Sequence, residues 1–397
     1  SAEKCSETYT VSLSDIKPVL ISATHEVCSH SEHHKKVKDG KELTNVKLIS
    51  GAANARYYVA VTENNDVYTW GQGHSLTAHK NPNIDVITGD IQKIVATKDK
   101  IYALTSEKEV WEWEGREGRP TKLDISDVKD VVGYDQTVLV LKENGMVYGK
   151  GKNDYGQLGN GLDANISSLT YLGINDIKAV GLGYRHSLFI ENNGKVFGMG
   201  WNSYRQLANA NDGVLEEFTK ISTISGVDHI AANAYTSYAV KDNQLHAWGE
   251  LLGGDFGLTT NRPRIINAGD FTNKGEIVNI KGSPFHYQQT SILLDNGNVY
   301  TWGNNTWRNG AGRMQGNYTI GKLEHDPNNN AYTPNTVDGV TYVVDEKVPI
   351  PKGEIKLVDA VQGFFSGVAI DKTGILLSWG GNNFDAWGVG SPQLWDY

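Results

Sequence analysis

One hairpin unit recurs along the chain, and this repetition restricts the possible folds more than any other feature. Each copy has an apolar strand, a turn rich in acidic residues, Asn and Gly, and a second apolar strand that usually closes in Gly. Asn-Gly between alternating apolar runs is a strong hairpin signal, because a type I′ turn needs positive φ at both central residues. Seven copies are present, at residues 59–71, 101–113, 139–151, 188–200, 238–249, 292–303 and 368–380.

A second signature, of the form Val/Ile-x-x-Val/Ile, precedes each hairpin and usually ends in Gly. The combined unit returns after about 40 to 50 residues in most copies, which is the period of a four-stranded propeller blade. The predicted fold class is therefore all-β, a seven-bladed β-propeller. The signatures span residues 46–51, 91–96, 128–133, 177–181, 227–232, 277–282 and 356–363.

The order of the copies predicts how the ring closes. The signature at residues 46–50 has no hairpin before it, and the last hairpin has no signature after it. We therefore expect residues 46–50 to complete the last blade, residues 364–397, because closure removes an exposed strand edge. The chain then divides into an N-terminal extension, residues 1–43, and one propeller, residues 44–397, with an insertion at about residues 304–353.

Composition agrees with this fold and narrows the possible partners. The chain has 44 Gly, 19 Tyr and 10 Trp against 3 Met, which favours a turn-rich β protein over a helical bundle. The net charge of -9 argues against nucleic acid or an anionic membrane as the main partner. No apolar stretch is long enough to span a membrane, so we expect no membrane insertion.

Residues 147–159 and 183–188 resemble a known repeat. Val147-Tyr-Gly-Lys-Gly-Lys-Asn-Asp-Tyr-Gly-Gln-Leu-Gly159 is similar to the Val-Tyr-x-Trp-Gly-x-Asn-x-x-Gly-Gln-Leu-Gly pattern of the RCC1 (regulator of chromosome condensation) superfamily. Gly183-Tyr-Arg-His-Ser-Leu188 is similar to the front half of the repeat. The resemblance covers roughly residues 44–397 and implies a seven-bladed propeller, although Gln-Leu is kept only at residues 157–158 and 206–207.

Two kinds of member indicate what such a propeller does. The eukaryotic one is a nucleotide exchange factor that contacts chromatin, a role that the acidic balance and the missing basic tail disfavour here. Secreted bacterial members, of the β-lactamase inhibitory protein II type, bind enzymes through aromatic residues on the loops of one face. The resemblance to this type implies a binding protein.

Aromatic residues occur in the loop between signature and hairpin in six of the seven copies. A ring would gather them round one mouth of the central channel, and Tyr, Trp and Arg dominate interface hot spots. We predict a partner-binding face here; the alternative is that some rings pack between blades. The candidates are Tyr57, Tyr134, Tyr184, Arg185, Tyr235, Phe285, Tyr287, Phe364 and, in the insertion, Trp307.

The tryptophans of the Trp-Gly pairs have a different expected role. A position that recurs in each repeat usually belongs to the core between blades. We expect such core positions at Trp70, Trp113, Trp248, Trp302 and Trp379.

The N-terminal extension matches no blade. Cys5 and Cys28 are expected to form a disulfide if the protein is secreted, and two free thiols are the alternative. A histidine cluster at residues 25–34 could ligate Zn²⁺ or Cu²⁺, but its spacing matches no closed site, so we expect a solvated flank and no metal.

Motifs for catalysis are missing from the sequence: there is no Gly-x-Ser-x-Gly, no His-Glu-x-x-His and no phosphate loop. We therefore expect a non-catalytic binding protein without a cofactor, secreted or on a cell surface, in the bacterial extracellular space or periplasm. The start at Ser1 looks like a mature terminus or the boundary of a cloned fragment. The expected partner is a protein or glycan on a host or competitor surface, as for an adhesin or virulence factor; an enzyme inhibitor and a lectin are the alternatives.

Overall fold

The computed structural model describes most of the chain between residues 41 and 304, together with short stretches outside that range. The described residues are 9–12, 16–17, 19–20, 35–38, 41–52, 55, 57–159, 164–221, 224–249, 265–282, 289–297, 299–304, 318–321, 357–362, 366–372, 374 and 376–380. Several predictions lie outside them, namely those on Cys5, Cys28, the histidine cluster, Phe285, Tyr287, Trp307 and Phe364. No helix in the described part of the chain is long and apolar enough to cross a membrane.

The described residues form seven four-stranded sheets. The first is β6 (Val46–Gly51), β7 (Tyr57–Thr62), β8 (Val67–Gly71) and β9 (Ser75–Lys80). The second is β10 (Ile91–Ala96), β11 (Ile101–Thr105), β12 (Val110–Trp113) and β13 (Thr121–Lys122). The third is β14 (Val128–Tyr134), β15 (Thr137–Lys142), β16 (Val147–Gly151) and β17 (Ile166–Ile174).

The remaining sheets continue in chain order. The fourth is β18 (Ile177–Leu182), β19 (His186–Glu191), β20 (Val196–Trp201) and β21 (Val214–Ile221). The fifth is β22 (His229–Ala232), β23 (Thr236–Lys241), β24 (Gln244–Gly249) and β25 (Ile266–Asp270). The sixth is β26 (Ile277–Gly282), β27 (Gln289–Leu294), β28 (Val299–Asn304) and β29 (Tyr318–Gly321). The seventh is β30 (Leu357–Gln362), β31 (Ser366–Asp371) and β32 (Leu376–Gly380), joined by β3 (Val19–Leu20).

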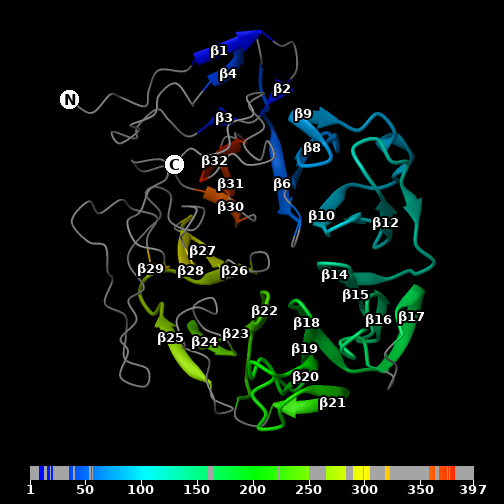
Figure 1. Ribbon diagram of the computed structural model, residues 1–397, viewed down its shortest axis with the longest axis vertical. Coiled ribbons are helices and arrows are strands. Elements are labelled where there is room, and N and C mark those ends of the chain that lie inside the picture. The colour runs from blue at the N-terminus through cyan, green and yellow to red at the C-terminus, as the bar shows by residue number, and fades with distance from the viewer. Residues whose placement is uncertain are drawn as a thin grey trace.

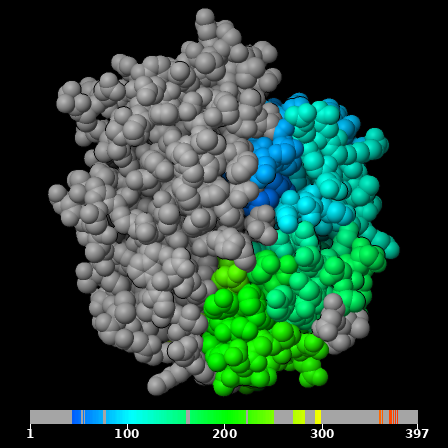
Figure 2. Space-filling model, in the orientation of Figure 1, coloured from blue at the N-terminus to red at the C-terminus, as the bar shows by residue number. Residues whose placement is uncertain are grey.

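These sheets follow one another around a common centre, with the first strand of each repeat innermost (Figure 1). Each inner strand contacts the inner strand of the next sheet, and β30 contacts β6. Figure 2 shows the first four sheets as one continuous surface in chain order along one side. The arrangement is the predicted β-propeller.

The Asn-Gly hairpin turns differ from the predicted type I′ conformation, because among the described residues Gly145, Gly194 and Gly297 have positive φ and the preceding Asn does not. Asp242 and Asn243 both have positive φ, 51° and 57°, between β23 and β24. Two consecutive positive φ values are the requirement of a type I′ turn, which matches the twist of the flanking strands. The turn at Asp242 and Asn243 is thus type I′, whereas the other hairpins have one described turn residue with positive φ, namely Asn65, Lys108, Gly145, Gly194, Gly297 or Gly374.

The same turns join one sheet to the next. The backbone N–H of Ile177, at the start of β18, donates to the carbonyl of Gly145 in the preceding hairpin at 3.2 Å. Val46 N–H donates in the same way to Gly374 O at 3.0 Å, which links the first sheet to the seventh. A buried core cluster spans this seam and includes Trp70 of the first sheet and Val368 of the seventh.

An N-terminal strand completes the last sheet, but the prediction that residues 46–50 supply it was wrong. Residues 46–50 do not complete the last blade, because β6 pairs antiparallel with β7 inside the first sheet. The fourth strand of the seventh sheet is β3, which pairs parallel with β32 through Val19 opposite Leu377. A two-residue strand carries no periodicity that a sequence pattern could reveal.

Other strands of the N-terminal segment pair with each other. β1 (Tyr9–Ser12) pairs parallel with β4 (Lys35–Lys38), and β2 (Ile16–Lys17) pairs parallel with β5 (Lys41–Glu42). Strands of this segment therefore add to the propeller at the junction of its first and last sheets, where β2 also contacts β9.

The Trp-Gly tryptophans lie in the core wherever the structure describes their side chains. Trp70 and Trp248 are 0% exposed and Trp113 is 3% exposed. This confirms the prediction for these three; the side chains of Trp302 and Trp379 lie outside the described part.

Candidate binding site

Strand order determines which loops share one end of the propeller. Because the strands of each repeat alternate in direction, the loop after the first strand and the loop after the third strand lie at the same end. The hairpin turns and the links to the next sheet lie at the other end. We call the first of these ends the loop end.

Two of the predicted binding residues belong to the core. Tyr57 and Tyr134 are each 4% exposed. Tyr57 stacks on His74 with ring centroids 4.2 Å apart and donates its hydroxyl to Thr97 O. Burial raises the pKa of Tyr57 and Tyr134 above the ordinary tyrosine value. Both rings pack between sheets, which was the alternative stated for these residues. The prediction that Tyr57 and Tyr134 bind a partner was therefore wrong.

Two other predicted residues, Tyr184 and Tyr235, lie together at the loop end. Their rings meet edge to face at 6.1 Å. Three further rings join them, from Tyr155, Trp201 and Tyr204, and all five side chains are half-buried. We call these five residues the aromatic patch.

Trp201 is the hub of the aromatic patch. Its ring centroid is 5.0 Å from that of Tyr155, 5.3 Å from Tyr204, 5.4 Å from Tyr235 and 6.4 Å from Tyr184. Aromatic contacts at such distances hold rings in fixed mutual orientations. Each ring therefore presents its exposed part in a defined position.

An exposed aliphatic side chain extends the patch. Val214 lies opposite Trp201 in the pairing of β20 with β21, and it is 37% exposed. Directly opposed residues of an antiparallel pair point to the same face of the sheet. The indole N–H of Trp201 donates to the hydroxyl of exposed Ser203 at 2.7 Å, so its polar edge is satisfied.

Arg185, another predicted binding residue, is buried and contacts the aromatic patch at Tyr184. Its side chain is 4% exposed and forms ion pairs with Asp135 at 2.6 Å and Asp154 at 2.9 Å. The guanidinium carbon lies 4.1 Å from the centroid of the Tyr184 ring. Arg185 therefore fixes Tyr184 across two neighbouring sheets and is a positioning residue rather than an exposed contact.

The loops that carry Tyr155 and Tyr204 share one hydrogen-bonded scaffold. In the third sheet, Asn153 Oδ1 accepts from Leu158 N–H at 2.8 Å, and Gln157 Oε1 accepts from Tyr155 N–H at 3.0 Å. In the fourth sheet, the equivalent Asn202 and Gln206 make the same two bonds, at 2.9 Å each. The repeat thus places a tyrosine at the same point of both loops.

The loop of the fourth sheet differs from that of the third sheet at the two residues that flank the shared Asn. Trp201 stands where the third sheet has Lys152, and Ser203 where it has Asp154. Gln157 Nε2 donates to Asp154 Oδ1 at 3.2 Å, whereas the buried Gln206 Nε2 has no hydrogen-bond partner in the described structure.

The loop after Trp201 also lacks a glycine that the third sheet has at the equivalent position. Arg205 adopts φ 62° where the third sheet has Gly156 at φ 71°. A left-handed non-glycine residue and a buried unpaired amide both cost stability. The loop that follows Trp201 thus departs from the repeat at a cost in stability. Departures of this kind concentrate at functional sites.

Three patch residues and Val214 were not among the predicted candidates. The sequence does hold a signal for two of them, because Asn-x-Tyr-x-Gln-Leu occurs at residues 153–158 and again at 202–207. Trp201 and Val214 have no counterpart in that motif, and only the fold brings them to the other rings.

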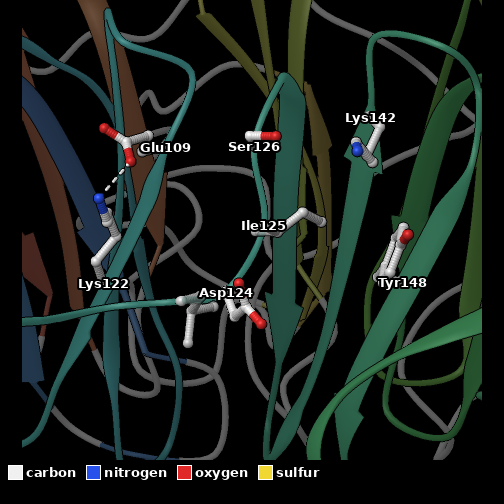
Figure 3. Close-up of a pocket in the computed structure, with 8 residues that line it drawn as sticks. Glu109, Lys122, Asp124, Ile125, Ser126, Lys142 and Tyr148 are labelled. Atoms are coloured by element: carbon white, nitrogen blue, oxygen red, sulfur yellow. Dashed lines mark ion pairs between the residues drawn. The ribbon is translucent and has the colours of Figure 1, made fainter.

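A separate cavity of about 530 Å³ opens at the opposite end of the sheets (Figure 3). Its wall includes the link between β13 and β14, with Leu123, Ile125 and Tyr148 as its larger apolar side chains. Glu109 and Lys122 form an ion pair of 2.8 Å across one side, which lowers the pKa of Glu109. None of the residues that line this cavity belongs to the aromatic patch.

Comparison with known proteins supports the repeat assignment. Residues 128–157 and 177–206 match one family model of the regulator of chromosome condensation (RCC1) repeat, and residues 144–190 match a second. The E3 ubiquitin-protein ligase HERC2 of Homo sapiens is 28% identical over an alignment of 160 residues, and the match covers 32% of this chain. The chain spans only 3% of the length of that relative.

Solved structures share the fold. Prp20p of Saccharomyces cerevisiae superposes with a TM-score of 0.56 at 17% identity, over 69% of this chain and 76% of that one. Yeast RCC1 (Prp20) bound to Kap60 gives 0.61 at 16% identity, over 86% and 82%. Human WBSCR16 gives 0.53 at 18% identity, over 89% and 81%. The chain therefore matches RCC1 repeats within residues 128–206, and its fold is an RCC1-like β-propeller.

Proposed function

We propose that this protein is a non-catalytic binding protein that holds a protein partner on its aromatic patch. The observation that carries the proposal is the cluster of five half-buried rings centred on Trp201. Trp and Tyr are enriched at the energetic centres of interfaces, where a ring is large, rigid and only partly exposed beforehand.

The support beneath the patch suits binding as well. The Arg185 ion pairs and the ring contacts hold the side chains in place before a partner arrives. A surface already fixed in its bound form loses little conformational entropy on association. The loop scaffold of Asn202 and Gln206 serves the same purpose for Tyr204.

Relatives by fold support a protein as the partner. The Prp20p structure is described with binding to Gsp1p and histones, and the second yeast structure is a complex with Kap60. We extend to this chain only the general chemistry, a propeller that binds proteins. We place it in the bacterial extracellular space or periplasm, where its role is that of an adhesin or virulence-associated factor.

Affinity capture tests this proposal. The full chain serves as bait beside the variant Trp201→Ala/Tyr235→Ala and the matched control Tyr171→Ala, which removes an exposed ring on β17. We expect the patch variant to lose the partner and the control to keep it, with both retaining the melting temperature of the parent chain within a few degrees. Partner capture that survives the double substitution would refute the proposal.

Two assays separate the alternatives. Inhibition of a β-lactamase at nanomolar protein would assign the chain to the inhibitor class. Sugar-specific retention on a glycan array that depends on Trp201 would assign it to the lectins.

A further inference from the structure

We infer that the aromatic patch takes a cationic side chain, arginine or lysine, from a basic segment of its protein partner. This inference rests on the proposed function and names the chemistry of the partner. Two features carry it: the placement of charged groups around the rings, and the exposed ring surface itself.

Charges around the patch are arranged with cations inward and carboxylates outward. The side chains of Arg185 and Arg205 are 4% and 17% exposed. Those of Asp154 and Asp212, their ion-pair partners, are 39% and 73% exposed. A partner that approaches the rings therefore meets carboxylates, while the guanidinium groups lie behind them.

The inner cations are also already balanced. Arg185 lies between Asp135 and Asp154, so one positive charge faces two negative ones. Arg205 is paired with Asp212 at 3.4 Å. An acidic partner would thus find no free cation on these groups and would be repelled by the outer carboxylates, whereas a basic partner is attracted.

The rings add a favourable site for the cation itself. A guanidinium or ammonium group is attracted to an aromatic face, most strongly to that of Trp. Arg185 already makes this contact with Tyr184 from the inner side. The half-buried Trp201, with the Asp212 carboxylate on the loop that follows it, offers the exposed part of its ring to a cation from outside. Arginine suits this site best, because its planar group both stacks on rings and binds carboxylates.

Binding of short labelled peptides by the full chain tests the inference. The probes are octapeptides of alternating glycine with arginine, glutamate or serine, followed by fluorescence anisotropy. We expect the arginine peptide to bind, the other two not to bind, and affinity to fall as salt rises from about 50 to about 300 mM.

Three variants separate the patch from general attraction to an acidic protein. Trp201→Ala and Asp212→Lys should each weaken binding of the arginine peptide by about tenfold, the change expected for loss of one cation–ring or cation–carboxylate contact. Asp85→Lys makes the same charge change at an exposed site in η2 (Ile84–Val86), at the opposite end of the sheets, and should leave binding within about twofold. Circular dichroism confirms that each variant is folded.

Failure of this inference is distinct from failure of the proposed function. No binding of the arginine peptide, equal binding of the glutamate peptide, or equal losses in Asp212→Lys and Asp85→Lys would overturn the inference. Capture of a protein partner that depends on Trp201 but not on salt or Asp212 would also overturn it, while leaving the proposed function intact. Retention of a glycan in place of a protein would overturn both.

Discussion

Replacing His186 with glutamine should flatten the dependence of stability on pH. His186 is 0% exposed, and its Nε2 lies 2.9 Å from the hydroxyl of Ser237, which donates to Gln206 O. Burial lowers the pKa of His186 from 6.5 to about 3. Between pH 6.5 and about pH 3, the His186 ring is therefore neutral in the folded chain and protonated in the unfolded chain.

The sign and size of the effect follow from this difference. Below pH 6.5 the unfolded chain binds a proton that the folded chain refuses, so the free energy of unfolding falls as the pH drops toward 3. Between pH 7 and pH 5 the loss from this one residue is about 2 kcal/mol, at about 1.36 kcal/mol per pH unit of titration.

Denaturant unfolding at pH 7 and pH 5 measures this loss. His186→Gln keeps an N–H donor near Ser237 but cannot titrate, so its stability should change by about 2 kcal/mol less than that of the parent between these pH values. His74, whose pKa burial lowers to about 4, contributes equally to both proteins. His229→Gln, at an exposed position, is the matched control and should behave as the parent. An unchanged pH dependence in His186→Gln would refute the reasoning.

Three further substitutions test the packing on which the site depends. Trp248→Ala should cost about 3–5 kcal/mol in denaturant unfolding, because the ring is fully buried between sheets; a loss below about 1 kcal/mol would contradict its core role. Gly374→Ala should lower stability by at least about 1 kcal/mol, because φ is +81° and the new methyl group would lie 2.9 Å from Asn45 Cα at the junction of the first and last sheets; an unchanged melting temperature would contradict that junction. Ser203→Asp should raise stability by about 1 kcal/mol by giving the Gln206 amide an acceptor, and a decrease would show that the unpaired amide is not a cost.

The propeller could be predicted from the sequence because its determinants are local. Each hairpin turn has at least one described residue with positive φ, such as Gly145, Gly194 or Asn243, so the local turn signal recurs once per repeat. The closing strand could not be predicted, since β3 is two residues long and pairs with β32 from the far end of the chain. Pairing over such a separation leaves no periodic trace in the sequence.

The site was predictable only in part for a similar reason. The repeat places Tyr134, Tyr184 and Tyr235 in equivalent loops, yet Tyr134 is 4% exposed while the other two are half-buried. Whether a loop ring faces the core depends on the neighbouring sheet, which the repeat pattern does not encode. Trp201 was missed because it replaces Lys152 at a position where the repeat itself gives no aromatic signal.

Fluorine NMR of the chain labelled with 5-fluorotryptophan tests the central claim most directly. The Trp201 resonance, assigned through Trp201→Phe, should shift or broaden when the captured partner is added, whereas those of the buried Trp70 and Trp248 should not move. A Trp201 resonance that stays unchanged under saturating partner would contradict the assignment of the aromatic patch as the binding site.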